Sequence, residues 1–165
     1  RIHWLTLAQK ALSSWQTQKI PEDTMIDVQA MPFIADIPRV QSERRADETA
    51  FWFEGQSTSF GELETRSNQV ANGLIGHGVE PGDRVAYLAK NTDVYYEMLF
   101  GCAKARAVMT GVNTRLAAPE IQFILADSKA RILFVGKEFY SIIDQIRDES
   151  SFTRPARPAS PRACS

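Results

Sequence analysis

The sequence predicts an α/β fold in which helices alternate with the strands of a parallel sheet. Three short β-type runs, at 85–89, 108–112 and 132–135, are separated by segments whose apolar residues have helical spacing. The third run is continuously apolar, as in a strand covered on both faces. Strands that alternate with helices of this length form βαβ units with right-handed crossovers. The chain of 165 residues is 44% hydrophobic with a formal net charge of -1, which is typical of a globular domain.

A loop, a short helix and a β-hairpin are predicted before the first of these strands. Residues 25–49 read as a loop that leads into a short helix at the charged run 43–48. The mixed signs of that run indicate a solvated surface. Ala50 to Phe53 is a β-type run, and Glu54-Gly55-Gln56 is a turn that returns the chain into a second strand.

A capped helix follows the hairpin. Ser59 and Glu62 fit a capping box, in which each side chain accepts a hydrogen bond from the other residue's backbone N–H. The helix ends in the glycines around His77, and Gly82 stands where a type II turn in the segment 80–83 needs a glycine. The predicted buried face of this helix consists of Leu63, Val70, Ala71, Leu74 and Ile75.

Three more helices connect and follow the strands. Asn91 or Thr92 is placed to cap the first of them, and Pro119 opens the second, where its missing N–H costs nothing. The third helix precedes residue 150. The positions predicted to face inward are Val94, Tyr95, Met98, Leu99 and Cys102, then Ile121, Ile124 and Leu125, and finally Phe139, Ile142, Ile143 and Ile146.

Few residues of the chain are arranged for chemistry. The glycines at 73, 76, 78 and 82 leave a helix and enter a strand, which is the reverse of a dinucleotide-binding loop. His3 and His77 are far apart and lack neighbours at metal-ligand spacing. Glu62 and Glu64 are two apart on a helix, so they point in different directions and cannot form an acid–base pair. Walker and Gly-x-Ser-x-Gly motifs are absent from the sequence.

The two cysteines do not indicate a disulfide framework. Cys102 lies in a helical stretch and is interpreted as a small buried apolar residue, and Cys164 is near the end of the chain. Such cysteine usage favours a reducing compartment. The near-neutral charge gives no reason to expect nucleic acid as a partner, and no apolar run approaches the ~20 residues that span a bilayer.

Ordered motifs run through the middle of the chain. One is Gly78-Val79-Glu80-Pro81-Gly82-Asp83-Arg84, and the others lie at 58–63, 68–74, 103–105, 112–116 and 118–135. Their order and spacing resemble the start of adenylate-forming (AMP-binding) enzymes, which include acyl-CoA synthetases, luciferases and the adenylation domains of peptide synthetases. The segment 118–135 is most similar to bacterial fatty-acyl-CoA synthetases, that is, long-chain-fatty-acid–CoA ligases.

This resemblance implies the N-terminal part of the large domain of a fatty-acid–CoA ligase. The complete enzyme would convert a fatty acid, ATP and CoA into acyl-CoA, AMP and pyrophosphate through an acyl-adenylate, with magnesium neutralising phosphate charge. The family's phosphate loop, adenine pocket, ribose-binding Asp and C-terminal Lys have no counterpart in the sequence. We therefore assign no catalytic, cofactor-binding or metal-binding residue to this chain and expect it to be inactive alone.

Two residues depart from the family pattern. Arg106 stands where the family usually has a helix-ending glycine, and a non-glycine residue in left-handed geometry costs roughly 1 kcal/mol or more. Gly111 stands where a proline before the Asn is common, so we expect a looser strand end there.

The two ends of the chain differ from its middle. Residues 1–24, loosely amphipathic, are interpreted as an N-terminal extension outside the family, and 25–149 as part of the family's N-terminal domain. Residues 150–165, rich in Arg and Pro, are expected to be a disordered tail or the product of a reading-frame shift. The expected location is cytoplasmic, with peripheral contact with a membrane as an option.

Two other functions are compatible with the sequence. The chain could be a non-catalytic α/β module that binds a partner or ligand, or one half of a split adenylating enzyme. In the main interpretation, its partner is the missing remainder of the same enzyme.

Overall fold

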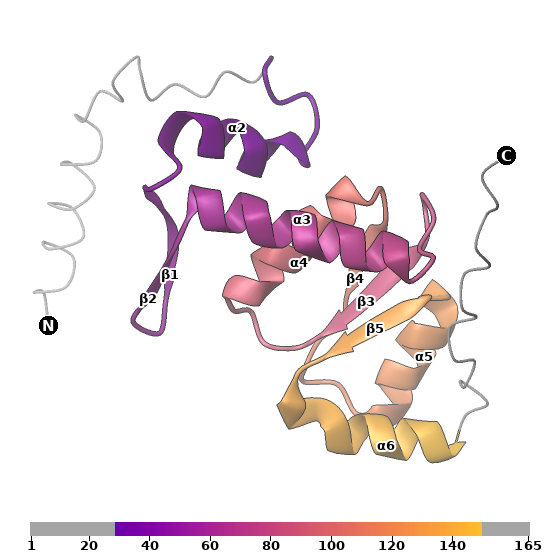
Figure 1. The fold of residues 1–165 in the computed structure, drawn as a ribbon. Helices are drawn as coiled ribbons and strands as arrows, with labels where there is room; N and C mark the ends of the chain where they lie inside the picture. Colours follow the sequence, from indigo (N-terminus) through magenta and orange to yellow (C-terminus); the bar gives the residue numbers. More distant parts are fainter. Residues whose placement is uncertain (1–28, 150–165) are drawn as a thin grey trace, which may run out of the picture. The chain divides into compact units, whose positions relative to one another are not determined.

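The computed structural model describes residues 29–149, in which a three-stranded parallel sheet carries helices on both faces (Figure 1). The strands are β3 (Arg84–Leu88), β4 (Val108–Gly111) and β5 (Ile132–Val135), in the order β4-β3-β5. Both neighbours run parallel to β3, with Val85 opposite Met109 in one pair and opposite Ile132 in the other. The predicted α/β fold with a parallel sheet is therefore confirmed.

The central strand β3 is buried on both faces. Val85 and Tyr87 belong to a core cluster with α3 (Phe60–Gly76) and α4 (Asp93–Lys104). Ala86 and Leu88 belong to a second cluster with α5 (Ala118–Ser128) and α6 (Tyr140–Glu149). Because successive strand side chains point to opposite faces, these four residues divide the core into two layers.

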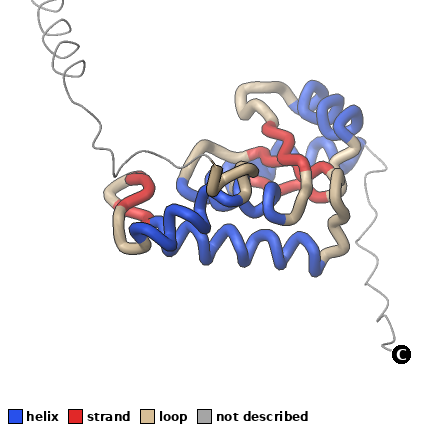
Figure 2. The backbone as a smooth tube through the Cα atoms, turned by 90° about the horizontal axis from the view of Figure 1, so that it is seen from above, coloured by secondary structure: helices blue, strands red, loops and turns tan. Residues whose placement is uncertain are grey.

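The N-terminal elements lie beside the start of α3. Helix α2 (Asp36–Arg45) begins well before the charged run in which a helix was predicted, and Pro38 fits because it lies in the first turn. The predicted hairpin is confirmed as β1 (Thr49–Phe53) and β2 (Gln56–Ser59). Glu54 and Gly55 both have positive φ, as a two-residue type I′ turn requires. Figure 2 shows this hairpin apart from the parallel sheet.

Local signals of the sequence set the beginning and the inward face of α3. The capping box is confirmed, since the Ser59 N–H donates to Glu62 at 2.9 Å and the Glu62 N–H donates to the Ser59 hydroxyl at 3.2 Å. Ile75 was predicted to be buried, but it is 56% exposed. The buried stripe runs through Leu63, Ser67, Ala71 and Leu74, and each further residue turns about 100° around the helix. Ile75 therefore lies past the edge of the stripe.

Three predictions about α4 and β5 are wrong. Thr92 occupies the N-cap of α4 without a side-chain hydrogen bond, and its carbonyl accepts from the Tyr95 N–H at 3.1 Å instead. Val94 is exposed rather than inward. Strand β5 was predicted to be covered on both faces, but among residues 29–149 it is an edge strand, and its Phe134 is 37% exposed.

The remaining elements follow the prediction closely. Pro119 lies in the first turn of α5, and the Ala117 N–H before it donates to Glu120 at 2.8 Å. A short 3-10 helix (Lys137–Phe139) leads into α6. The buried apolar residues of these segments include Ile121, Leu125, Phe139 and Ile146. None of the helices between residues 29 and 149 is long and apolar enough to cross a membrane.

Helices α3 and α4 end in the same backbone motif but with different residues. In α3 the N–H groups of Gly78 and Val79 donate to the carbonyls of Ile75 and Leu74, which is a Schellman motif with Gly78 at φ 76°. In α4 the equivalent left-handed residue is Arg106, at φ 58°. As expected from the sequence, Arg106 adopts the left-handed conformation at the helix end where the family usually has a glycine. The predicted turn is also present, with Gly82 at φ 89°.

Replacing Arg106 by glycine should stabilise the chain. We expect Arg106→Gly to raise the free energy of unfolding by roughly 0.5–1 kcal/mol, because relief of the left-handed strain exceeds the entropy that glycine gains in the unfolded chain. The control is Gly78→Ala at the equivalent position of α3. This substitution should lower the free energy of unfolding. Urea unfolding followed by circular dichroism measures both, and an unchanged or lower stability of Arg106→Gly would contradict this account.

The crossing of α3 and α4 depends on a glycine. A methyl group at Gly101 would come within 2.5 Å of Val70 Cβ, would overlap its Cγ1 and would lie 3.1 Å from the Ser67 carbonyl oxygen. Since these atoms belong to the facing helix, the absence of a side chain at Gly101 sets how closely the two helices approach. Gly73 is a glycine inside α3. A methyl group added there would have no heavy atom of a neighbouring element within 4 Å.

The two helical glycines should respond to alanine with opposite signs. Gly101→Ala should lower the free energy of unfolding by about 1–3 kcal/mol, because the added methyl group overpacks the helix crossing. Gly73→Ala should raise it by roughly 0.5–1 kcal/mol through helix propensity alone. Thermal unfolding of the two variants measures the difference, and stabilisation by Gly101→Ala would show that the helices do not approach this closely.

Candidate functional site

The carboxyl ends of β3 and β5 form the candidate functional site. The loop after β3 leads to α4 on one face of the sheet, whereas the loop after β5 leads to α6 on the other. Open α/β sheets bind ligands in the crevice at such a switch point. A hollow of about 620 Å³ lies here, bounded by Phe53, Glu54, Tyr87, Ala89, Lys90, Asn91, Thr92, Val94, Phe134, Val135, Gly136 and Glu138.

The polar groups around this hollow mainly fix its loops. The Tyr87 hydroxyl donates to the Lys90 carbonyl oxygen at 3.2 Å and so holds the loop after β3. Burial raises the pKa of Tyr87, which keeps this phenol protonated as a donor. Lys90, Glu54 and Glu138 are the charged residues of the lining.

The described residues do not fit ATP or magnesium. Between residues 29 and 149, no group of three or more His, Cys, Asp or Glu side chains could hold a metal ion. The glycines that could suggest a phosphate loop serve as a helix end at Gly78 and a turn at Gly82. His77 is exposed, with its Nδ1 2.8 Å from the Gly73 carbonyl oxygen. We therefore derive no catalytic step from this part of the chain.

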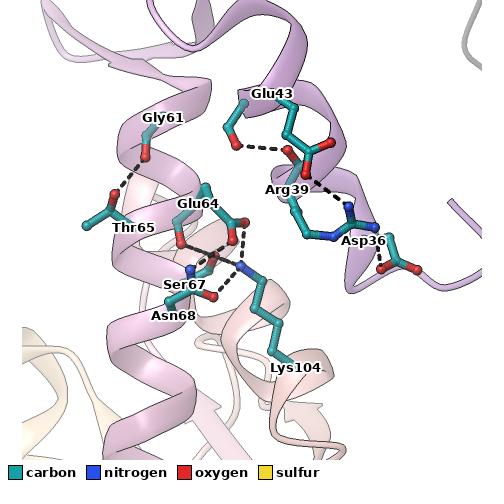
Figure 3. Close-up of polar contacts among 10 residues, drawn as sticks. Asp36, Arg39, Glu43, Gly61, Glu64, Thr65, Ser67, Asn68 and Lys104 are labelled. Atoms are coloured by element: carbon teal, nitrogen blue, oxygen red, sulfur yellow. Dashed lines mark hydrogen bonds and ion pairs between the residues drawn. The ribbon is translucent and has the colours of Figure 1, made fainter. Parts of the chain in front are cut away.

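A convergent polar cluster links α3 to α4. The Lys104 ammonium donates to the Glu64 carboxylate and lies 2.8 Å from both the Ser67 hydroxyl and the Asn68 amide oxygen (Figure 3). The side chains of Lys104 and Glu64 are 13% and 19% exposed. Because an ammonium has three donors and all are used, Lys104 acts as a clamp between helices rather than as a catalytic base.

The two acids on α3, Glu62 and Glu64, point to different partners, as their spacing in the sequence predicts. Glu62 caps the helix and lies 3.4 Å from Arg66, whereas Glu64 reaches Lys104. The prediction that the two carboxylates cannot act together is confirmed. Lys104 and Ser67 were missed as parts of the clamp, because no local pattern links residues 37 positions apart.

Cys102 has the properties of a core residue. Its side chain is buried against the α3–α4 cluster, and burial raises the pKa of its thiol to about 11. A thiol in this state is not a nucleophile near neutral pH. The interpretation as a small buried apolar residue is confirmed, while Cys164 and His3 lie outside the described residues.

Removing the Lys104 ammonium should destabilise the chain. Lys104→Met should lower the free energy of unfolding by about 1.5–3 kcal/mol, because the partly buried Glu64 loses its charged partner. The matched control is Arg39→Met in α2, whose exposed ion pairs with Asp36 and Glu43 also appear in Figure 3. We expect that change to leave stability nearly unaltered. Equal effects of the two substitutions, measured by urea unfolding, would contradict the role of Lys104 as a clamp.

The chain matches one protein family over most of its length. The family model described as "AMP-binding enzyme" matches residues 38–161. Among curated proteins, a fatty acid–[acyl-carrier-protein] ligase, ScoC of Streptomyces coeruleorubidus, is 46% identical over 93 residues, which cover 56% of this chain and 18% of that protein. A feruloyl-CoA synthase of an Amycolatopsis species is 47% identical over 85 residues, which cover 52% of this chain and 17% of that protein. The chain thus spans less than a fifth of the length of these relatives.

Solved structures give the same result for the fold. A Mycobacterium tuberculosis fatty acyl CoA synthetase superposes with a TM-score of 0.68 at 32% identity, covering 72% of this chain and 24% of that one. This likeness supports the α/β fold with a three-stranded parallel sheet.

Proposed function

This chain belongs to the AMP-binding, adenylate-forming enzyme family and covers its N-terminal part, and we propose that the complete enzyme activates a fatty acid. The proposed reaction joins the fatty acid to a thiol through an acyl-adenylate, with ATP, magnesium and CoA as the cosubstrates that the family implies. The observation that supports a fatty acid as the substrate is the 46% identity to a fatty acid ligase. That relative acts on an acyl carrier protein, so a carrier-protein thiol is a second candidate for the acceptor.

An aromatic acid is a second candidate substrate. It is favoured by the 47% identity to a feruloyl-CoA synthase over 85 residues, which is close to the 46% identity to the fatty acid ligase over 93 residues. The structural likeness does not separate the two candidates, because an anthranilate CoA ligase and a fatty acyl CoA synthetase superpose with TM-scores of 0.66 and 0.68.

In either case, the role proposed for this chain is that of a scaffold. The clamp at Lys104 and the buried strand β3 support such a role, because both hold the fold together and neither presents a reactive group. The predicted extension at 1–24 and the predicted tail at 150–165 lie outside the described residues and stay predictions. The cytoplasmic location, with peripheral contact with a membrane as an option, also stays a prediction.

The test begins with the coding sequence. Translation in all three frames after the Arg147 codon should reveal a Ser/Thr/Gly-rich loop that ends in Pro-Lys-Gly within some tens of codons. Absence of such a loop in every frame would favour a non-catalytic binding module.

ATP–pyrophosphate exchange then tests the activity. We expect exchange from the complete product with medium- or long-chain fatty acids, little with ferulate or benzoate, and none from the 165-residue chain. Preference for an aromatic acid would select the second candidate, and exchange by the chain alone would refute the scaffold role. Exchange that appears only when a separate ATP-binding chain is added would identify a split enzyme.

A further inference from the structure

A second hollow of about 620 Å³ is bounded by the start of α2, the end of α4 and the beginning of β4. Its lining consists of the segment 33–36, the α4 residues Leu99, Cys102, Ala103 and Lys104, and the segment 106–109. Most of these side chains are apolar. Pockets of this size and composition bind small organic ligands, and a few polar groups in them fix the orientation of the ligand.

Exposed apolar side chains gather at this hollow. Phe33 is 71% exposed, Ile34 is 53% exposed and Val108 is 50% exposed, and all three belong to its lining. The first two lie before α2, whereas Val108 begins β4, so segments far apart in the sequence contribute to one surface. Single exposed apolar residues are ordinary, but a group of them at one place marks a binding surface.

The hollow carries one positive charge that the chain does not compensate. Asp36 pairs with Arg39 at 3.1 Å, and its other carboxylate oxygen accepts from a backbone N–H at 3.2 Å. Lys104 is held by Glu64 and two further acceptors (Figure 3). The third charged residue of the lining, Arg106, is exposed, and its guanidinium has no partner among residues 29–149.

The conformation of Arg106 also points to a role for its side chain. The residue is left-handed at φ 58°, where the resemblance to the family implies a glycine and where a glycine would relieve the strain. Strained residues of this kind cluster at functional sites. The backbone here needs only a glycine, so binding by the guanidinium explains why the chain carries a strained arginine.

We propose that this hollow binds the anion of a fatty acid, with the carboxylate on Arg106 and the alkyl chain on the apolar lining. A guanidinium pairs with a carboxylate through two parallel hydrogen bonds and is more weakly hydrated than an ammonium, which suits the edge of an apolar pocket. A flexible alkyl chain fits this lining, because Phe33 is the single aromatic residue among the described lining residues. The site needs neither ATP nor another part of a ligase, so it goes beyond the proposed function.

Isothermal titration calorimetry of the 165-residue chain tests the site with decanoate below its micelle concentration. We expect saturable binding with a dissociation constant below about 1 mM. Hexanoate should bind at least about tenfold more weakly, because each buried CH₂ group strengthens binding. Decanol has a chain of the same length but no charge, and it should bind at least about fivefold more weakly than decanoate.

Three variants locate the carboxylate. Arg106→Gly should weaken decanoate binding at least about tenfold although it stabilises the chain, so unfolding does not explain the loss. Arg106→Lys keeps the charge and should bind decanoate more tightly than Arg106→Gly. Val108→Asp adds a negative charge to the lining at an exposed position and should also weaken binding, and this variant decides the question if Arg106→Gly proves unstable.

The matched control is Arg84→Gln. Arg84 is an exposed arginine whose guanidinium has no partner among residues 29–149, but it lies outside the lining of the hollow. Its replacement should leave decanoate binding unchanged. Equal losses for Arg106→Gly and Arg84→Gln would show a general attraction to positive charge and would overturn the proposal.

Further results would contradict the site. They are the absence of saturable decanoate binding, decanoate affinity that Arg106→Gly leaves unaltered, and equal affinity for decanoate and decanol. Tighter binding of benzoate than of decanoate would assign the hollow to an aromatic acid instead. ATP–pyrophosphate exchange by the complete product tests the proposed function separately, so failure of that activity and failure of this site are distinguishable.

Discussion

The two-sided burial of β3 is the constraint on which the rest of the structure depends. Val85, Ala86 and Leu88 are fully buried, and Tyr87 nearly so, although they point alternately to opposite faces. A strand of this kind requires a helix layer on each side and a hydrogen-bonded strand along each edge. Helices α3 and α4 supply one layer, α5 and α6 supply the other, and β4 and β5 supply the edges.

The layer made by α3 and α4 is held by two contacts that reinforce each other. Gly101 lets the helices approach until its Cα faces Val70, and Lys104, one turn further along, closes the crossing with Glu64 and Ser67. The lysine is paired with an acid and its ammonium is saturated with acceptors. The polar residues of this layer therefore stabilise the scaffold.

The sequence predicted the order of the elements because each has a local signal. The capping box at Ser59, the glycine turn at Gly82 and the apolar periods act within a few residues, and the structure confirms them. The Lys104 clamp could not be predicted, since it joins positions far apart in the sequence. Val94 and Phe134 were predicted to be buried but are exposed, because periodicity identifies the apolar side of an element without showing what covers it. No site residue was predicted, and the hollow at the strand ends was recognisable only once the topology was known.

Hydrogen exchange of the backbone amides tests the central claim, a sheet built around β3 with an open edge at β5, most directly. Mass spectrometry of the isolated chain should find the slowest exchange in the segment 84–88 and faster exchange in 132–135, where only one side of the strand is hydrogen-bonded within the described residues. Protection of 132–135 equal to that of 84–88, in a chain shown to be monomeric, would contradict the account, because the edge of β5 would then already be covered.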